Sequence, residues 1–270
     1  MKRSIFILLI FSCFLQSFSQ TKMIISKTNG TDSLWMSDIK SITFKTYTTI
    51  PTDSLIAWYS FNGNANDYSG KGNNGTNNGA TLTTDRFGNS NSAYSFNGTS
   101  NYINVPSLNN IQYFPVTYSV WVKTVGLVTN LFMGSPGWGG FNAIIGRDAS
   151  GNTTEGLLAL SKLIPPSTLT LDNKIWYYTG ATSANYDYTP PLNTWIHIVY
   201  TSDGSQSKLY VNGALYQTIA FTATQNANIN FNIGSGGGRG FWNGLIDDIR
   251  IYKRTLSDLE IQSLYHEGGW

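Results

Sequence analysis

Apolar and polar residues alternate with a period of two along most of the chain after residue 55, and turn-forming residues separate the alternating runs. This pattern predicts antiparallel strands that bury one face. Asp203-Gly204 and Asn212-Gly213 are dipeptides typical of tight hairpin turns. The clearest predicted strands are 55–61, 93–96, 102–105, 117–122, 157–160, 195–201, 208–211, 229–233 and 245–252.

One helix is predicted, near the C-terminus. Ser257 and Glu260 have the spacing of a capping box, and Leu256 with Ile261 supplies the apolar staple across it, so we expect a helix over 258–265. Many short strands without helices between them are typical of two packed sheets. The pattern therefore predicts an all-β, two-sheet antiparallel sandwich that ends in a short helix.

The first 19 residues have the features of a secretory signal peptide. Two basic residues precede an apolar run over 5–15, and Ser17 and Ser19 are the small residues expected before a cleavage site. The run is too short for a permanent membrane anchor, and no later stretch is long enough. We therefore expect a secreted or cell-surface protein without a transmembrane segment. Cys13 is the single cysteine, and its lipidation after cleavage is the less favoured alternative.

The segment 20–54 separates this leader from the main domain. An Asn29-Gly30 turn lies between short apolar runs, which predicts a small β-hairpin extension. A Thr-rich linker with Pro51 follows it. We expect the principal domain to cover 55–270.

Several motifs of this domain resemble a known family. The closing segment 243–252 reads Asn-Gly-Leu-Ile-Asp-Asp-Ile-Arg-Ile-Tyr and precedes the predicted helix. Together with earlier motifs it resembles a laminin-G-like domain of the concanavalin A-like lectin/glucanase superfamily, and the resemblance implies a jelly roll. The earlier motifs are 56–63, 67–70, 74–76, 94–98, 102–103, 118–122, 195–199, 209–213 and 233–234.

Charge excludes some classes of partner. The chain has 17 Lys and Arg against 15 Asp and Glu, and two of the basic residues, Lys2 and Arg3, lie in the predicted leader. The remaining chain is neutral and has no basic cluster. Nucleic acid is therefore not an expected partner.

The sequence offers little support for catalysis. Glycosidases of this fold resemble one another in a Glu-x-Asp-x-Glu strand, whereas Glu155, Glu260 and Glu267 are the only glutamates and lack that spacing. Asp247 and Asp248 are adjacent on a predicted strand, so we expect their side chains to point to opposite faces. His197 lies in a strand that resembles a packing motif of the family. We therefore expect no catalytic residues.

A structural calcium site is a further expectation. Asp247 aligns with a calcium-binding aspartate of related jelly rolls, and Ca²⁺ takes six to eight oxygen ligands, many of them carbonyls. The resemblance thus implies Asp247 as a ligand, with the carbonyls of Ser60 and Gly98 beside it. Asp67, in a turn rich in oxygen donors, is an additional candidate. The alternative is that such residues only form turns.

Aromatic residues suggest where a ligand binds. The stretches 125–142 and 161–192 are more aromatic than the family's loops and rich in Gly, Pro, Ser and Asn. Exposed rings there would stack on sugar rings, although rings folded back over a sheet are an equal alternative. The candidate ligand-binding residues are Trp138, Trp176, Tyr177, Tyr178 and Tyr186, with Tyr188 nearby.

These observations favour a secreted, non-catalytic binding module that recognises a glycan or an extracellular or cell-surface protein. Two alternatives stay open. One is a polysaccharide lyase or hydrolase on the same scaffold, and the other is a structural adhesion domain, because this fold hosts all three.

Overall fold

The computed structural model describes residues 22–27, 30–35, 49–109, 114–126, 140–149, 153–162, 172–179, 182–222 and 230–270. The chain forms two compact units, 1–46 and 47–270. In the first unit, β1 (Lys22–Lys27) pairs with β2 (Gly30–Trp35) as the predicted antiparallel hairpin. The predicted signal peptide, including Cys13, lies outside the described residues.

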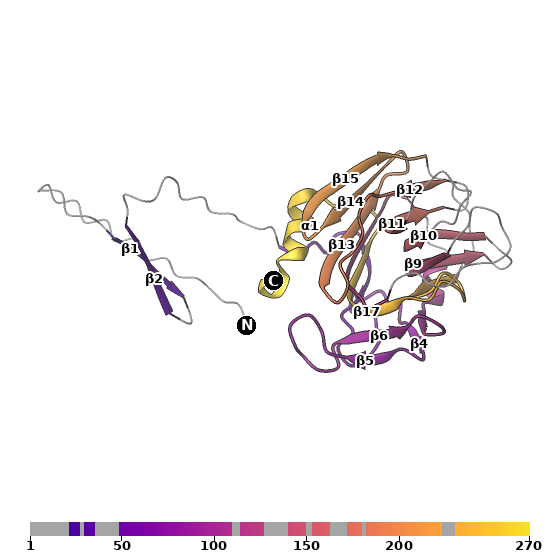
Figure 1. Ribbon diagram of the computed structural model, residues 1–270, viewed down its shortest axis with the longest axis horizontal. Coiled ribbons are helices and arrows are strands. Elements are labelled where there is room, and N and C mark those ends of the chain that lie inside the picture. The colour runs from indigo at the N-terminus through magenta and orange to yellow at the C-terminus, as the bar shows by residue number, and fades with distance from the viewer. Residues whose placement is uncertain are drawn as a thin grey trace, which may run out of the picture. The chain divides into compact units, whose positions relative to one another are not determined.

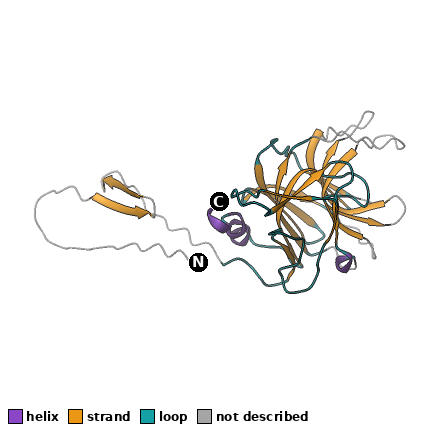
Figure 2. Cartoon of the chain, turned by 90° about the horizontal axis from the view of Figure 1, so that it is seen from below, coloured by secondary structure: helices purple, strands orange, loops and turns teal. Residues whose placement is uncertain are grey.

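The second unit contains two antiparallel sheets packed face to face, as Figures 1 and 2 show. The sandwich fold predicted from the alternating pattern is therefore confirmed. One sheet has the order β12, β11, β10, β9, β16, β7, β4, and the other has the order β15, β14, β13, β8, β17, β6, β5, with β3 also paired to β17.

The seven-stranded sheet is made of β4 (Thr76–Asn78), β7 (Tyr102–Asn104), β9 (Gly140–Ala149), β10 (Thr153–Lys162), β11 (Asp172–Tyr178), β12 (Ser183–Asn185) and β16 (Asn230–Ile233). The eight-stranded sheet is made of β5 (Thr81–Thr83), β6 (Ala93–Asn97), β8 (Val116–Thr124), β13 (Trp195–Ser202), β14 (Gln206–Val211), β15 (Ala214–Ala220) and β17 (Asn243–Tyr252), together with β3 (Leu55–Tyr59). This unit also contains two 3₁₀ turns, η2 (Pro106–Leu108) and η3 (Glu267–Gly269).

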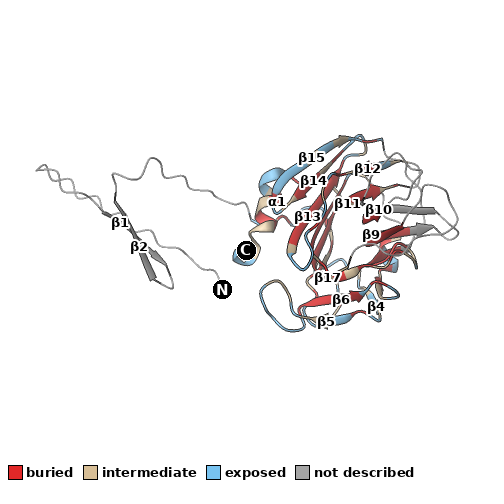
Figure 3. Cartoon of the chain, viewed as in Figure 1, coloured by how far each residue is buried: buried red, intermediate tan, exposed pale blue. Residues whose placement is uncertain are grey.

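The main core fills the space between the sheets, where buried positions are red in Figure 3. Alternate residues of β8, Tyr118, Val120 and Val122, point into this space. Ile103 of β7 and Ile233 of β16 point into it from the opposite sheet. The residues between them face outward, so the two outer faces carry the side chains available for other roles.

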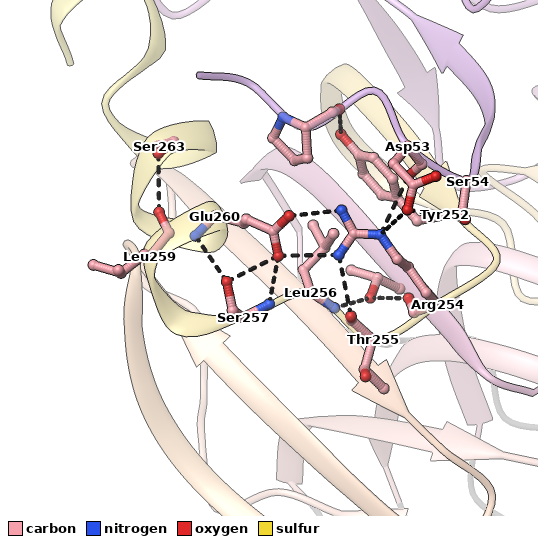
Figure 4. Close-up of polar contacts among 12 residues, drawn as sticks. Asp53, Ser54, Tyr252, Arg254, Thr255, Leu256, Ser257, Leu259, Glu260 and Ser263 are labelled. Carbon is pink, nitrogen blue, oxygen red and sulfur yellow. Dashed lines mark hydrogen bonds and ion pairs between the residues drawn. The ribbon is translucent and has the colours of Figure 1, made fainter. Parts of the chain in front are cut away.

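The predicted helix forms α1 (Asp258–Tyr265), which lies outside the eight-stranded sheet (Figure 1). Both halves of the Ser257–Glu260 capping box are present. Arg254 donates two hydrogen bonds to the Glu260 carboxylate, at 3.0 and 2.6 Å, which ties the helix start to the end of β17 (Figure 4). Among the described residues, no helix is long and apolar enough to cross a membrane.

The structure differs from the sequence-based prediction in the aromatic stretches. β11 occupies 172–178, inside a stretch that we expected to be a loop, and β9 begins at Gly140, inside the other. β11 does not show the alternation of apolar and polar residues that marks a strand, because large rings lie on both of its faces. Tyr177 points into the main core, whereas Trp176 joins a smaller cluster on the outer face.

Candidate functional site

An open pocket of about 460 Å³ lies on the outer face of the seven-stranded sheet, and we call it the amide pocket. The pairing register places Asn232 of β16 opposite Asn104 of β7, and Asn104 opposite Thr76 of β4. Because the adjacent Ile103 and Ile233 enter the core, these polar side chains face outward. The pocket is lined by Thr76, Asn78, Tyr102, Asn104, Asn232, Gly237 and Gly238.

Two of the amide side chains that line the pocket are hydrogen-bonded to each other. Nδ2 of Asn104 donates a hydrogen bond of 2.9 Å to Oδ1 of Asn232. Asn232 is only 4% exposed, so this bond fixes the orientation of a nearly buried amide. Tyr102 borders the pair and packs against Phe241, with ring centroids 6.4 Å apart. The pocket thus combines fixed hydrogen-bonding groups with an aromatic ring.

Two glycines without side chains form one wall of the amide pocket. Gly237 and Gly238 have φ of 79° and 84°, a left-handed conformation that glycine adopts without strain. A Cβ atom at Gly238 would meet nothing within 4 Å. The wall is therefore backbone, and a ligand can approach it closely.

A second polar cluster, on the outer face of the eight-stranded sheet, contains Asp247 and Asp248. The expectation that these two side chains point to opposite faces is wrong. The register of β17 against β8 shifts between Asp247 and Arg250, and Asp248 has φ of 45°. This β-bulge adds a residue on one strand and turns both carboxylates to one side. Nη1 of Arg86 lies 2.5 Å from Asp247 Oδ2, and its Nη2 lies 3.2 Å from Asp248 Oδ2.

Arg86 is the cationic centre of this cluster. Its side chain is 5% exposed and its guanidinium lies 4.7 Å from the ring centroid of Trp121. Burial raises the pKa of Asp247, and the Arg86 guanidinium opposes that shift. Asp248 also accepts a 2.8 Å hydrogen bond from Nε1 of Trp58. The carboxylates are therefore held by protein donors.

His197 packs beside this cluster as part of an aromatic stack. Its ring centroid lies 5.1 Å from that of Trp121 and 6.1 Å from that of Tyr265 in α1. Its Nε2 shares a 2.8 Å hydrogen bond with Ser119 Oγ. Burial lowers the pKa of His197 to about 3, and nearby arginines add to the shift. A 1% exposed, neutral imidazole has the environment of a packing residue.

Two of the candidate calcium ligands, Asp67 and Asp247, already have protein partners. Asp67 already accepts four hydrogen bonds from Trp58, Ser69 and Asn73; burial alone would raise its pKa, but these bonds lower it. The backbone N–H of Gly98 donates a hydrogen bond to the carbonyl of Trp242. Trp242 precedes Asp247 by five residues, which span about 16 Å in an extended strand. In the described residues no group of three His, Cys, Asp or Glu side chains is placed to hold a metal. Calcium binding by Asp247, Ser60, Gly98 and Asp67 stays a prediction.

The prediction of exposed aromatic loops is wrong for three residues. Trp176, Tyr177 and Tyr186 are 5%, 0% and 0% exposed. Tyr177 stacks on Tyr200 in the core at 3.9 Å between ring centroids. These rings are buried because β11 and the turn after β12 bring them against a sheet, so they offer no free face to a sugar.

Two of the remaining candidates lie differently. Tyr178 is half-buried and stacks on Trp176 at 5.0 Å, on the same outer face as the amide pocket. Tyr188 is half-buried and contacts Tyr216 of β15, an edge strand of the other sheet. Trp138 lies outside the described residues.

Sequence reasoning missed the residues of the amide pocket. Asn104 and Asn232 are polar residues in strands where apolar and polar residues alternate. This is the ordinary pattern of a sheet with one solvent-facing surface. Nothing local distinguishes them, since their partnership depends on β16 and β7 being neighbours despite their distance in the sequence.

Comparison with solved structures shows similar folds. Domain 4 of AbnA, an extracellular GH43 arabinanase from Geobacillus stearothermophilus, in complex with arabinotriose, has a TM-score of 0.57 at 21% identity, covering 78% of this chain and 98% of that domain. The binding domain of Paraclostridial Mosquitocidal Protein 1 has a TM-score of 0.59 at 21% identity, covering 80% and 52%. A Trypanosoma rangeli sialidase has a TM-score of 0.57 at 19% identity, covering 80% and 33%.

The chain therefore spans about half of the toxin binding domain and a third of the sialidase. No curated protein matches the chain. The family model Laminin_G_3 matches residues 97–262, which include β8, β17 and most of α1. With its two-sheet jelly roll and this match over more than half of its length, the chain belongs to the concanavalin A-like lectin/glucanases superfamily.

Proposed function

We propose that this protein is a carbohydrate-binding module and that the amide pocket is its binding site. The observation that carries the proposal is the Asn104–Asn232 amide pair beside the Tyr102 ring, in an open pocket with a glycine wall. Sugar hydroxyls both donate and accept hydrogen bonds, as amides do, and the apolar face of a sugar packs on an aromatic ring.

The similar structures support a binding role. One of them is named as a binding domain, and the arabinanase domain is described in complex with arabinotriose. Fold similarity alone does not transfer a ligand, because this fold serves several functions. The proposal therefore depends on the pocket, and these proteins make a glycan the first ligand class to test.

We further propose that the protein acts outside the cell. The support is the sequence of residues 1–19, with its basic start, apolar run and small residues before the cleavage position. A module at that location would meet polysaccharides or glycosylated surfaces. The same location suits an adhesion domain, so a protein partner is an outcome of the test below.

A glycan array followed by calorimetry tests the proposal. We expect a glycan to bind, and Tyr102→Ala to weaken binding about tenfold or more, because it removes the ring of the pocket. Tyr216→Ala is the matched control, because it removes a 46% exposed tyrosine from an edge strand of the other sheet. Binding that both variants retain would place the site elsewhere.

The same panel separates the alternatives. A lyase or hydrolase would release unsaturated products or reducing ends from a polysaccharide, and His197→Ala or Glu155→Ala would abolish that release. An adhesion domain would bind no glycan and would instead capture a protein from the host surface or matrix. Reversible glycan binding without product release supports the binding module.

A further inference from the structure

The residues that line the amide pocket indicate which class of glycan it can bind. Its lining residues, all within the described part of the chain, carry no charge: they present amides, two hydroxyls and a glycine backbone. An acidic sugar would bring a carboxylate into this pocket. A carboxylate removed from water without a cation or a charge-assisted donor is strongly disfavoured. The lining therefore favours an uncharged ligand.

The amide pair also has unused hydrogen-bonding capacity. Asn104 uses Nδ2 and Asn232 uses Oδ1 in the bond between them. Oδ1 of Asn104 and Nδ2 of Asn232 have no partner within the described residues, so the pair presents one acceptor and one donor. Nδ2 of Asn104 also donates a 3.4 Å hydrogen bond to the carbonyl of Phe231, which favours this orientation of the Asn104 amide. Two adjacent sugar hydroxyls, one donating and one accepting, complement this arrangement.

We propose that the amide pocket selects neutral over acidic glycans, and that the Asn104–Asn232 pair binds two adjacent hydroxyls of one sugar ring. This inference rests on the proposed function, since it assigns the ligand class of the same pocket. Tyr102 supplies the ring that packs on the sugar, and the Gly237–Gly238 wall leaves space for the next unit of an oligosaccharide.

Calorimetry on the full chain with matched neutral and acidic probes tests the selection. The probes are lactose with sialyllactose, galactotriose with trigalacturonate, and arabinotriose alone. We expect measurable binding of at least one neutral probe and at least tenfold weaker binding of its acidic counterpart. Asn104→Ala and Asn232→Ala should each weaken neutral binding about tenfold, the effect of losing one buried hydrogen bond.

Two charge-changing variants sharpen the test. Asn232→Asp keeps the side-chain shape but replaces the donor with a negative charge, so neutral binding should fall about tenfold or more. Asn78→Lys adds a cation to the lining and should shift the preference toward acidic probes by about tenfold. Asn62→Ala is the matched control, an exposed asparagine beyond the end of β3, and should change nothing.

The outcomes separate this inference from the proposed function. If acidic probes bind as tightly as neutral ones and Asn232→Ala abolishes both, the pocket is a glycan site but the selection is overturned. If no probe binds, or if binding is unaffected by Asn104→Ala and Asn232→Ala, the pocket assignment fails and the inference fails with it. Circular dichroism of each variant confirms that a loss of binding does not reflect unfolding.

Discussion

The guanidinium of Arg86 lies 2.5 Å from the carboxylate of Asp247, with both side chains almost fully buried on the outer face of the eight-stranded sheet. The two residues come from strands and turns distant in sequence, and the β-bulge at Asp248 adds a second carboxylate to the same guanidinium at 3.2 Å. Arg86 thus links the turn before β6 to β17. This arrangement leads to the first two predictions.

Replacing Arg86 with methionine should destabilise the fold strongly. Arg86→Met keeps most of the apolar stem but leaves Asp247 buried without its cation, and breaking a buried ion pair in this way costs about 3–5 kcal/mol. Urea unfolding monitored by tryptophan fluorescence measures the change. Lys174→Met, which breaks an ion pair with the exposed Asp187, should cost less than about 1 kcal/mol. Equal effects would contradict the buried pair.

The predicted calcium site at Asp247 can be tested by thermal unfolding. Arg86 contacts the Asp247 carboxylate, so a calcium ion would compete with this guanidinium. If calcium binds as predicted, the melting temperature is higher in millimolar CaCl₂ than in excess EDTA, and equal melting temperatures would contradict the site. A rise with calcium that Asp247→Ala abolishes would show that the ion replaces Arg86, because a ligand of the native state alone raises stability with its concentration.

His197 should remain neutral in the folded protein down to pH 4. Burial lowers its pKa to about 3. Because the unfolded histidine binds a proton near pH 6.5 and the folded one does not, this residue lowers stability as pH falls from about 7 toward 3. NMR titration of the imidazole signals from pH 4 to 8 measures the protonation of His197. The His266→Gln variant identifies which signals belong to His197. A His197 inflection near pH 6.5 would contradict its burial.

Glu260 should make the helix start sensitive to acid. Hydrogen bonds from Arg254, and further ones from Ser257, lower the pKa of Glu260 to about 2. A lowered carboxyl pKa contributes stability above the unfolded value near 4.5, which is lost as pH falls toward 2. Glu260→Gln should therefore be less stable than wild type at pH 7 by about 1 kcal/mol, and the difference should shrink below pH 4.

Thermal unfolding of both proteins between pH 2 and 7 checks this prediction. Asp187→Asn is the control, because its carboxylate is 77% exposed and contacts a single lysine. A constant difference between Glu260→Gln and wild type across this range would show that the Arg254 ion pair does not stabilise the helix start.

Local sequence determined the elements whose signals are complete within a few residues. The capping box of Ser257 and Glu260 placed α1 at 258–265 without reference to the rest of the chain, because both hydrogen bonds close within one helical turn. Period-two alternation located β13 and β17 within two residues at each end, because each strand has one face in the core. The jelly roll followed from such strands and from the family motifs.

Tertiary structure decided the features that depend on neighbours far apart in the chain. Alternation alone placed Asp247 and Asp248 on opposite faces, and only pairing with β8 revealed the bulge that unites them on Arg86. The sequence places Trp176 in a predicted loop, whereas pairing with β10 makes its segment a strand.

The amide pocket is the clearest case of this kind. Asn104 and Asn232 are unremarkable solvent-facing residues by sequence, and they became one binding surface because β7 and β16 are neighbours in the sheet. Period-two alternation fixes which face of a strand a residue occupies, but not which strand lies beside it. The sequence by itself therefore determined the fold class and the closing helix, and strand order decided where the candidate site lies.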